Sequence, residues 1–356
     1  MKILKRIIAL ASVAVMSITM FSSCNKNEVI TIEKKPATEK IQRNTGIVCW
    51  GSSIGYSQYK CSFTKVIEDH MMSDECYIPV VNMSVPKDST KTILARAGIT
   101  KILVSKKFTV PKGLDPVEIQ FKAEDNSYIF PLRYGIYCDG GMSNVTIGNV
   151  KGTLSITKDS AQRAKPKYYF TRKKEGKEVV INKGEQIISD SMTMYSDYIP
   201  VICMGEAGTW NDAKDLIKQQ QALINSCKDK DKFVIVGMFN VPLKDADNMD
   251  EDEKYKLQKK ENEKMDAALA KHWGDHYINI REYLCSEESI KYIESKDIEF
   301  DKDDKKKIKD KMIPESLKYD NENLLDVAYQ LIGDAVYEKL VELDYLYHKT
   351  PGDLKK

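Results

Sequence analysis

The sequence predicts a doubly wound α/β domain, in which helices cover both faces of a parallel sheet, with a β-rich insertion inside it. Short apolar runs that stop at turns alternate with segments of helical periodicity; the runs are 47–50, 78–82, 198–204 and 233–239. The chain closes on apolar residues at helical spacing, namely Val327, Leu331, Ala335, Val336 and Leu340. Residues 100–190 break the alternation, because they are β-branched, aromatic and turn-rich with little helical period.

The N-terminus has the order of a secretory signal. Lys2, Lys5 and Arg6 precede an apolar stretch, 7–21, which is short for a membrane span, and small residues follow it. Ser22 and Ser23 lead directly into Cys24, which resembles the lipobox of bacterial lipoproteins, where the cysteine becomes the lipidated first residue. We therefore expect a signal peptide over 1–23 and a membrane-anchored, extracytoplasmic protein of the bacterial cell envelope. The alternative is an ordinary signal peptide followed by a coincidental cysteine.

The polar residues after Cys24 predict a tether over 24–44, since they lack any apolar period that could bury a face. The formal charge of the chain is +2, from 55 basic and 53 acidic residues. Without the three basic residues of the signal the balance is 52 against 53, or −1. A near-neutral chain with mixed charges lacks the concentrated basic face that nucleic acid requires, so we expect no nucleic-acid partner. Hydrophobic residues at 42% and charged residues at 30% exclude a disordered chain.

No metal and no cofactor is expected from the motifs. The seven cysteines after Cys24 form no CxxC pair and are odd in number, which fits neither a disulfide framework nor a zinc site. The sequence also has no HExxH, no Walker loop and no GxGxxG after a predicted strand. The chain is then organised as an α/β domain in two parts, 45–99 and 191–346, around the insertion at 100–190, with a tail at 347–356. The insertion either carries substrate contacts or is a decorative or oligomerising flap.

Open α/β sheets bind ligands at the carboxyl ends of their strands, and three such ends carry polar residues. They are Gly51-Ser52-Ser53-Ile54, the stretch 81–89, and Gly208-Thr209-Trp210-Asn211-Asp212. In that order and spacing they resemble the blocks of the SGNH (GDSL-type) serine hydrolases, a family of esterases and lipases. The resemblance implies a flavodoxin-like, three-layer α/β/α fold with a parallel central sheet. Taken singly, each block is weak, because Gly-Ser-Ser is common turn chemistry and Asn211-Asp212 is equally a good helix N-cap.

The resemblance assigns roles to individual residues. Ser53 matches the nucleophile, and Asn211 matches the side-chain donor of the oxyanion hole, with the Ser53 N–H as a further donor. Lys87 stands where the family has a glycine amide before an acidic residue. A lysine still offers its backbone N–H, but we expect it not to adopt the positive-φ conformations of a glycine.

The last block of the family reads Asp-x-x-His before a terminal helix. Here Asp320 stands at the acid and Asn323 stands at the histidine. An amide cannot accept the serine proton, and general-base catalysis is typically worth about 10²–10⁴ in rate. Glu322 is a spare carboxylate that serves as a weak base only if burial raises its pKa, and His348 lies in the tail. The other three histidines, at 70, 272 and 276, are expected to be structural or solvated.

Two functions follow, and Asn323 separates them. The first is a serine esterase acting on ester-bearing small molecules or glycans, impaired because its catalytic base is missing. The second is a pseudoenzyme, a non-catalytic protein that binds a ligand or glycan on a hydrolase scaffold. A third class, a structural surface protein whose insertion binds a partner, requires no pocket and predicts a groove beside Ser53 filled with side chains.

Overall fold

The computed structural model describes residues 46–56, 61–74, 78–129, 144–156, 166–244, 246–320 and 323–346. All of them belong to one compact unit, Arg43–Lys356. The predicted signal peptide, the tether with Cys24, the tail with His348, and Glu322 lie outside the described residues. Within the segments that the structure describes, no helix has the length and apolarity needed to cross a membrane.

The first sheet is parallel and lies where the sequence predicts it. Its five strands run in the order β2 (Val80–Asn82), β1 (Ile47–Gly51), β12 (Ile199–Cys203), β13 (Val234–Val236) and β14 (Tyr277–Ile278). Each of the four predicted apolar runs overlaps one of these strands. The strand β1 is buried along its whole length and pairs with β12 and β2 on its two sides. Such full burial is typical of a parallel strand covered on both faces.

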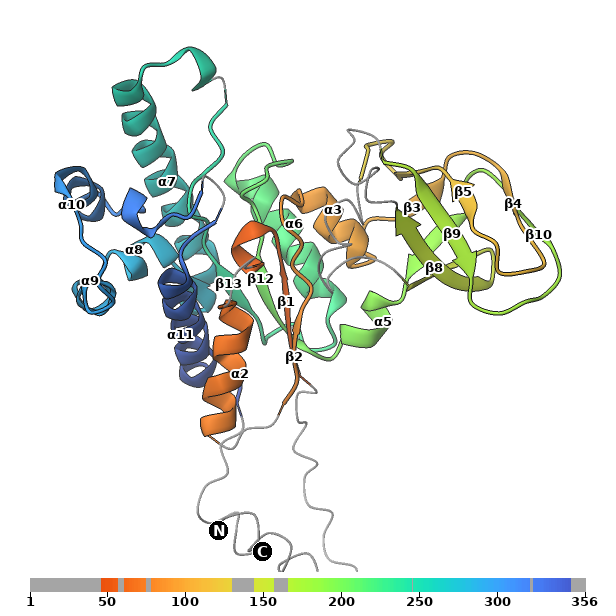
Figure 1. The fold of residues 1–356 in the computed structure, drawn as a ribbon, viewed down its shortest axis with the longest axis horizontal. Coiled ribbons are helices and arrows are strands. Elements are labelled where there is room, and N and C mark those ends of the chain that lie inside the picture. Colours follow the sequence, from red (N-terminus) through yellow and green to blue (C-terminus); the bar gives the residue numbers. More distant parts are fainter. Residues whose placement is uncertain are drawn as a thin grey trace, which may run out of the picture. The chain divides into compact units, whose positions relative to one another are not determined.

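Alternate strand residues face two separate hydrophobic clusters, so the sheet has a helical layer on each side. Cys49 and Val201 pack in the cluster that contains α2 (Phe63–Ser73) and α11 (Asp326–Glu342). Val48 and Ile202 pack in the other, with α3 (Thr90–Arg96), α6 (Ala213–Ser226) and α7 (Glu251–Trp273). Figure 1 shows α2 and α11 side by side, in agreement with their contacts. The predicted α/β class is therefore confirmed, together with its parallel sheet.

The remaining helices are short. They are α5 (Ser191–Tyr195), α8 (Ile280–Leu284), α9 (Glu287–Glu294), α10 (Lys302–Lys309), and the 3-10 turns η2 (Ser53–Gly55), η4 (Ala246–Asn248), η5 (Gly274–His276) and η6 (Glu315–Leu317). Leu284 of α8 and Ile293 of α9 are buried in the same cluster as α11. Several helices begin at side-chain caps, since Ser89, Asp212 and Asp250 each accept a hydrogen bond from the backbone N–H three residues on.

The second sheet is antiparallel, and its strands all come from the predicted insertion. The order is β5 (Val117–Ile119), β9 (Tyr168–Arg172), β8 (Val150–Ile156), β7 (Asn144–Ile147), β11 (Gln186–Ser189), β3 (Ile102–Val104) and β6 (Phe121–Ala123). Because β5 and β6 follow each other along the chain and pair with β9 and β3 respectively, the sheet nearly closes into a barrel. Its own core includes Val145 and Phe170. A separate pair, β4 (Phe108–Val110) with β10 (Val179–Ile181), adds to it.

Candidate functional site

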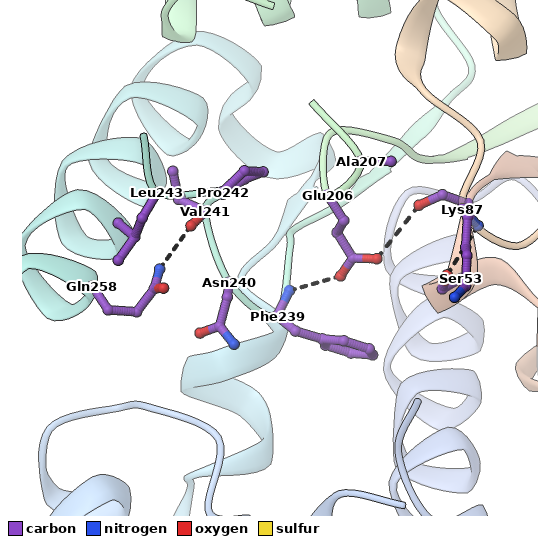
Figure 2. A pocket seen from close by; sticks show the side chains of 11 residues that line it. Ser53, Lys87, Glu206, Ala207, Phe239, Asn240, Val241, Pro242, Leu243 and Gln258 are labelled. Carbon is purple, nitrogen blue, oxygen red and sulfur yellow. Dashed lines mark hydrogen bonds between the residues drawn. The ribbon is translucent and has the colours of Figure 1, made fainter. Parts of the chain in front are cut away.

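Ser53 lies in a pocket at the carboxyl ends of β1, β12 and β13. The chain leaves β1 at Gly51 and turns into η2, which places Ser53 at the edge of the sheet with 7% of its surface exposed. The pocket has a volume of about 350 Å³, and Figure 2 shows most of its side chains. We call it the Ser53 pocket; its lining residues are Ser52, Ser53, Lys87, Glu206, Ala207, Phe239, Asn240, Val241, Pro242, Leu243 and Gln258.

The backbone of Lys87 lies next to Ser53, as the sequence analysis predicts. It does so in a positive-φ conformation, which the sequence analysis did not expect for a lysine. The Lys87 N–H donates a hydrogen bond to Ser53 Oγ at 3.1 Å. The φ angle of Lys87 is 62°, which is the left-handed region that the missing glycine would occupy. The expectation that a lysine would avoid this region is wrong. A left-handed residue other than glycine costs roughly 1–2 kcal/mol, so the surrounding loop must hold Lys87 in place.

A buried ion pair next to Lys87 provides that hold. Arg96 of α3 is fully buried, and its Nε donates to Asp88 Oδ2 at 2.6 Å. Arg96 Nη1 also donates to the Met83 carbonyl at 2.7 Å, which ties both ends of the loop after β2 to α3. Burial raises the pKa of Asp88 to about 6, although the Arg96 guanidinium opposes this rise. The pair therefore fixes the backbone on both sides of Lys87.

Glu206 is the residue in this pocket that the sequence analysis missed. It follows β12 through Gly205, whose φ of 139° turns the chain at the strand end. One of its carboxyl oxygens accepts a hydrogen bond from the Phe239 N–H at 3.0 Å (Figure 2). The other accepts a hydrogen bond from the Ser52 hydroxyl at 3.4 Å. The sequence feature that could have identified Glu206 is an acidic residue directly after a glycine at the end of a predicted strand.

Glu206 is tuned by its surroundings. Desolvation raises its pKa to about 7, even though hydrogen bonds from Phe239, Ile54 and Ser52 and the charge of Arg281 act in the opposite direction. A carboxyl group with this pKa exchanges its proton near neutral pH, so it is able to donate or to accept a hydrogen bond there. Perturbed carboxyl groups in pockets are characteristic of functional sites.

The floor of the Ser53 pocket is held by Arg281, which is almost completely buried. Its guanidinium donates to the carbonyls of Met238 and Phe239 and pairs with Asp266 at 2.5 Å. Gln258 of α7 donates to the Val241 carbonyl at 2.8 Å. The segment after β13 is thus fixed at both ends, and Asn240 and Gln258 offer amide groups within a rigid wall.

Asn323 forms the contact to Asp320 that the resemblance gives to a histidine. Its Nδ2 donates to both carboxyl oxygens of Asp320, each at 2.9 Å, and its backbone N–H donates to Oδ1 at 2.7 Å. The side chain is buried, and Asn323 Oδ1 has no hydrogen-bond partner among the residues described. Neither Asp320 nor Asn323 is among the lining residues of the Ser53 pocket. An amide oxygen accepts a hydrogen bond but does not take up a proton near neutral pH.

Asn211 is not among the lining residues of the Ser53 pocket. Its side chain is exposed, and its Nδ2 donates to Asp215 Oδ2 at 3.0 Å, within the first turn of α6. Asp212 caps the same helix by accepting from the Asp215 N–H at 2.8 Å. The two residues therefore have the capping geometry that was the alternative interpretation of this motif. A role for Asn211 at the oxyanion requires its side chain to leave Asp215.

The three described histidines each have a local partner. His70 Nε2 lies 2.7 Å from Asp334 Oδ1, which joins α2 to α11. His276 stacks on Phe233, and His272 packs edge-on against Trp273. None of them lines the Ser53 pocket. Across the described segments, no group of three or more histidine, cysteine, aspartate or glutamate side chains is arranged to hold a metal ion.

Comparison with known proteins gave no relative: no family model matches the chain, and no curated protein or solved structure matches it.

Proposed function

We propose that this chain is a surface lipoprotein, anchored through Cys24, whose SGNH-type hydrolase scaffold binds a ligand without efficient ester hydrolysis. The strand order β2-β1-β12-β13-β14 supports the scaffold, because it corresponds to the 2-1-3-4-5 order of flavodoxin-like sheets. Ser53 at the end of the first strand, with the Lys87 N–H directed at its hydroxyl, supports the same assignment. Both features are also those that the family resemblance requires.

The observation that carries the proposal is the hydrogen bonding of Asn323. The Asn323 side-chain amide donates its hydrogen bonds to the Asp320 carboxylate, as a histidine N–H would. The only other polar atom of this side chain is its carbonyl oxygen. That oxygen cannot deprotonate Ser53, and a missing general base lowers the rate by about 10²–10⁴. The pocket itself is intact, so the capacity to bind a ligand does not depend on the base.

The open pocket also favours ligand binding over a purely structural role, which predicts a groove filled with side chains. The Ser53 pocket instead has room for a small molecule, and its polar groups converge on it. Lys87 and Glu206 both line the pocket and carry opposite charges when Glu206 is ionised, and Glu206 is partly neutral near pH 7. We therefore assign the ligand to uncharged molecules with hydrogen-bonding oxygens, such as esters, amides and sugar hydroxyls.

Slow ester hydrolysis is the second candidate, and Glu206 is the observation that favours it. General bases work best when their pKa is near the working pH, and Glu206 meets that condition in the same pocket as Ser53. In this case the Glu206 carboxylate accepts the Ser53 proton as Oγ attacks the ester carbonyl. The alcohol then leaves with a proton, and water releases the acyl group from Ser53.

Hydrolysis of p-nitrophenyl acetate by the purified protein distinguishes the two candidates. If the protein only binds, the rate equals that of Ser53→Ala and of the uncatalysed reaction. If Glu206 acts as the base, wild type exceeds Ser53→Ala, and Glu206→Gln falls to the level of Ser53→Ala. Glu251→Gln, an exposed glutamate at the start of α7, is the matched control.

A further inference from the structure

A second pocket adjoins the Ser53 pocket. Its volume is about 310 Å³, and three consecutive residues, Val241, Pro242 and Leu243, line both pockets. We call it the Trp210 pocket; its other lining residues are Trp210, Asn211, Asp212, Ala213, Lys244, Leu257, Glu261, Lys264 and Met265. Because one short segment of chain forms a wall of both, a ligand in the Ser53 pocket needs to pass only this segment to enter the Trp210 pocket.

The walls of the Trp210 pocket are rigid and mainly apolar. Trp210 Nε1 donates to the Gly205 carbonyl at 2.7 Å, which fixes the indole ring directly behind the turn that carries Glu206. Leu257 and Met265 approach from α7, and Met265 is buried. The segment 241–243 is held by the hydrogen bond from Gln258 to the Val241 carbonyl. An apolar group that enters this space exchanges water for preformed apolar contacts.

The charged groups at its edge balance one another. Lys264 lies 3.6 Å from Glu261, and Lys244 Nζ donates to the Asn211 carbonyl at 3.2 Å. Two lysines and two acidic residues line the pocket, so the net charge around it is zero. A charged ligand group would lose its hydration here without meeting an excess of the opposite charge, so binding of a charged group is disfavoured.

We propose that the Trp210 pocket is the second half of the ligand site and takes an uncharged alkyl group attached to the polar head in the Ser53 pocket. The ligand is thus an elongated, neutral, amphipathic molecule. This inference rests on the proposed binding function of the Ser53 pocket. Each methylene that enters the Trp210 pocket is worth about a fourfold gain in affinity, from about 0.8 kcal/mol for a buried CH₂.

The test uses a series of N-methyl amides, since amides carry the carbonyl of an ester but resist hydrolysis. N-methylacetamide, N-methylbutanamide and N-methylhexanamide are titrated into ¹⁵N-labelled protein. The backbone amides of Ser53 and Lys87 report on the Ser53 pocket, and the indole N–H of Trp210 reports on the second. The chain has three tryptophans, and Trp50 and Trp273 are buried, so the Trp210 signal is assigned by its loss in Trp210→Phe.

The expected result is that all three amides shift the Ser53 and Lys87 signals, while the Trp210 signal shifts more as the chain lengthens. Affinity rises about fourfold per methylene. Leu257→Gln abolishes this chain-length dependence and leaves the binding of N-methylacetamide unchanged. The matched control, Lys260→Gln, is an exposed residue on the same helix that lines neither pocket, and it changes nothing.

Two other outcomes separate the inference from the function on which it rests. If the Ser53 and Lys87 signals shift equally for all three amides and Trp210 does not respond, the second subsite is wrong and the binding function stands. If no amide shifts any of these signals at millimolar concentration, both the assigned ligand class and the second subsite are wrong.

Discussion

Replacing Glu206 by glutamine removes a titrating group from the pocket and should change how the stability of the protein depends on pH. The pKa of this carboxyl is about 7 in the folded protein, against an ordinary value of 4.5. Between these two values the folded protein holds a proton that the unfolded chain releases. The stability gained in this way is complete below pH 4.5 and is lost as the pH rises through 7.

The magnitude follows from the difference of about 2.5 between the two pKa values. One pKa unit corresponds to about 1.36 kcal/mol, which sets an upper limit of about 3 kcal/mol for Glu206. Since the side chain is only partly buried, solvent screening lowers the expected effect to about 1–3 kcal/mol. Glutamine keeps an acceptor for the Phe239 N–H, and the Ser52 hydroxyl is able to accept from its amide.

The assay is urea unfolding of wild type and Glu206→Gln at pH 5, 6, 7 and 8. We expect the free energy of unfolding of wild type, relative to the variant, to fall by about 1–3 kcal/mol from pH 5 to pH 8. Asp88 titrates in both proteins, so its contribution cancels in the difference. A difference that stays constant across this range, or rises with pH, would refute the assignment of the raised pKa to Glu206.

Three further substitutions test how the loop around Lys87 is held. Arg96→Met leaves the Asp88 carboxyl buried without its ion pair and should lower the free energy of unfolding by about 3–5 kcal/mol in urea denaturation; a loss under 1 kcal/mol contradicts the role of the pair. Lys87→Gly relieves the strain of a φ of 62° but adds entropy to the unfolded chain, so stability should change by less than about 1 kcal/mol, and a large loss speaks against this conformation. Gly55→Ala places a Cβ 2.0 Å from Ser84 Oγ and should lower the thermal midpoint through overpacking of about 1–3 kcal/mol, whereas an unchanged midpoint shows that η2 and Ser84 are not in close contact.

The sequence predicted the sheet because β1, β12 and β13 are buried along their whole length. Val48 and Ile202 face one helical layer while Cys49 and Val201 face the other, so both positions of the alternation must be apolar. The resulting apolar runs end at turns and are visible without a structure. The antiparallel sheet was visible as β-branched segments, but its near closure was not, since it depends on Val117–Ala123 pairing with two distant strands.

The site was harder to predict because its parts come from separate loops. Ser53 and Lys87 were identified by the resemblance of two strand ends to the SGNH blocks, and the structure brings them into contact. Asn211 was ambiguous between two roles, and its contact with Asp215 follows from local helix capping that competes with any longer-range role. Glu206 belongs to no sequence motif. Its raised pKa comes from desolvation in the folded protein, and its hydrogen-bond donor, the Phe239 N–H, lies thirty-three residues away along the chain.

Fluorophosphonate labelling of wild type, Ser53→Ala and Asn323→His tests the proposed loss of catalysis most directly, since this reagent reacts only with an activated serine. We expect wild type to stay unlabelled, like Ser53→Ala, because the Asn323 amide cannot accept the Ser53 proton. Asn323→His should gain labelling at Ser53 by supplying a base beside Asp320. Rapid labelling of wild type at Ser53, lost in Ser53→Ala, would contradict the proposal and make this protein an active serine hydrolase.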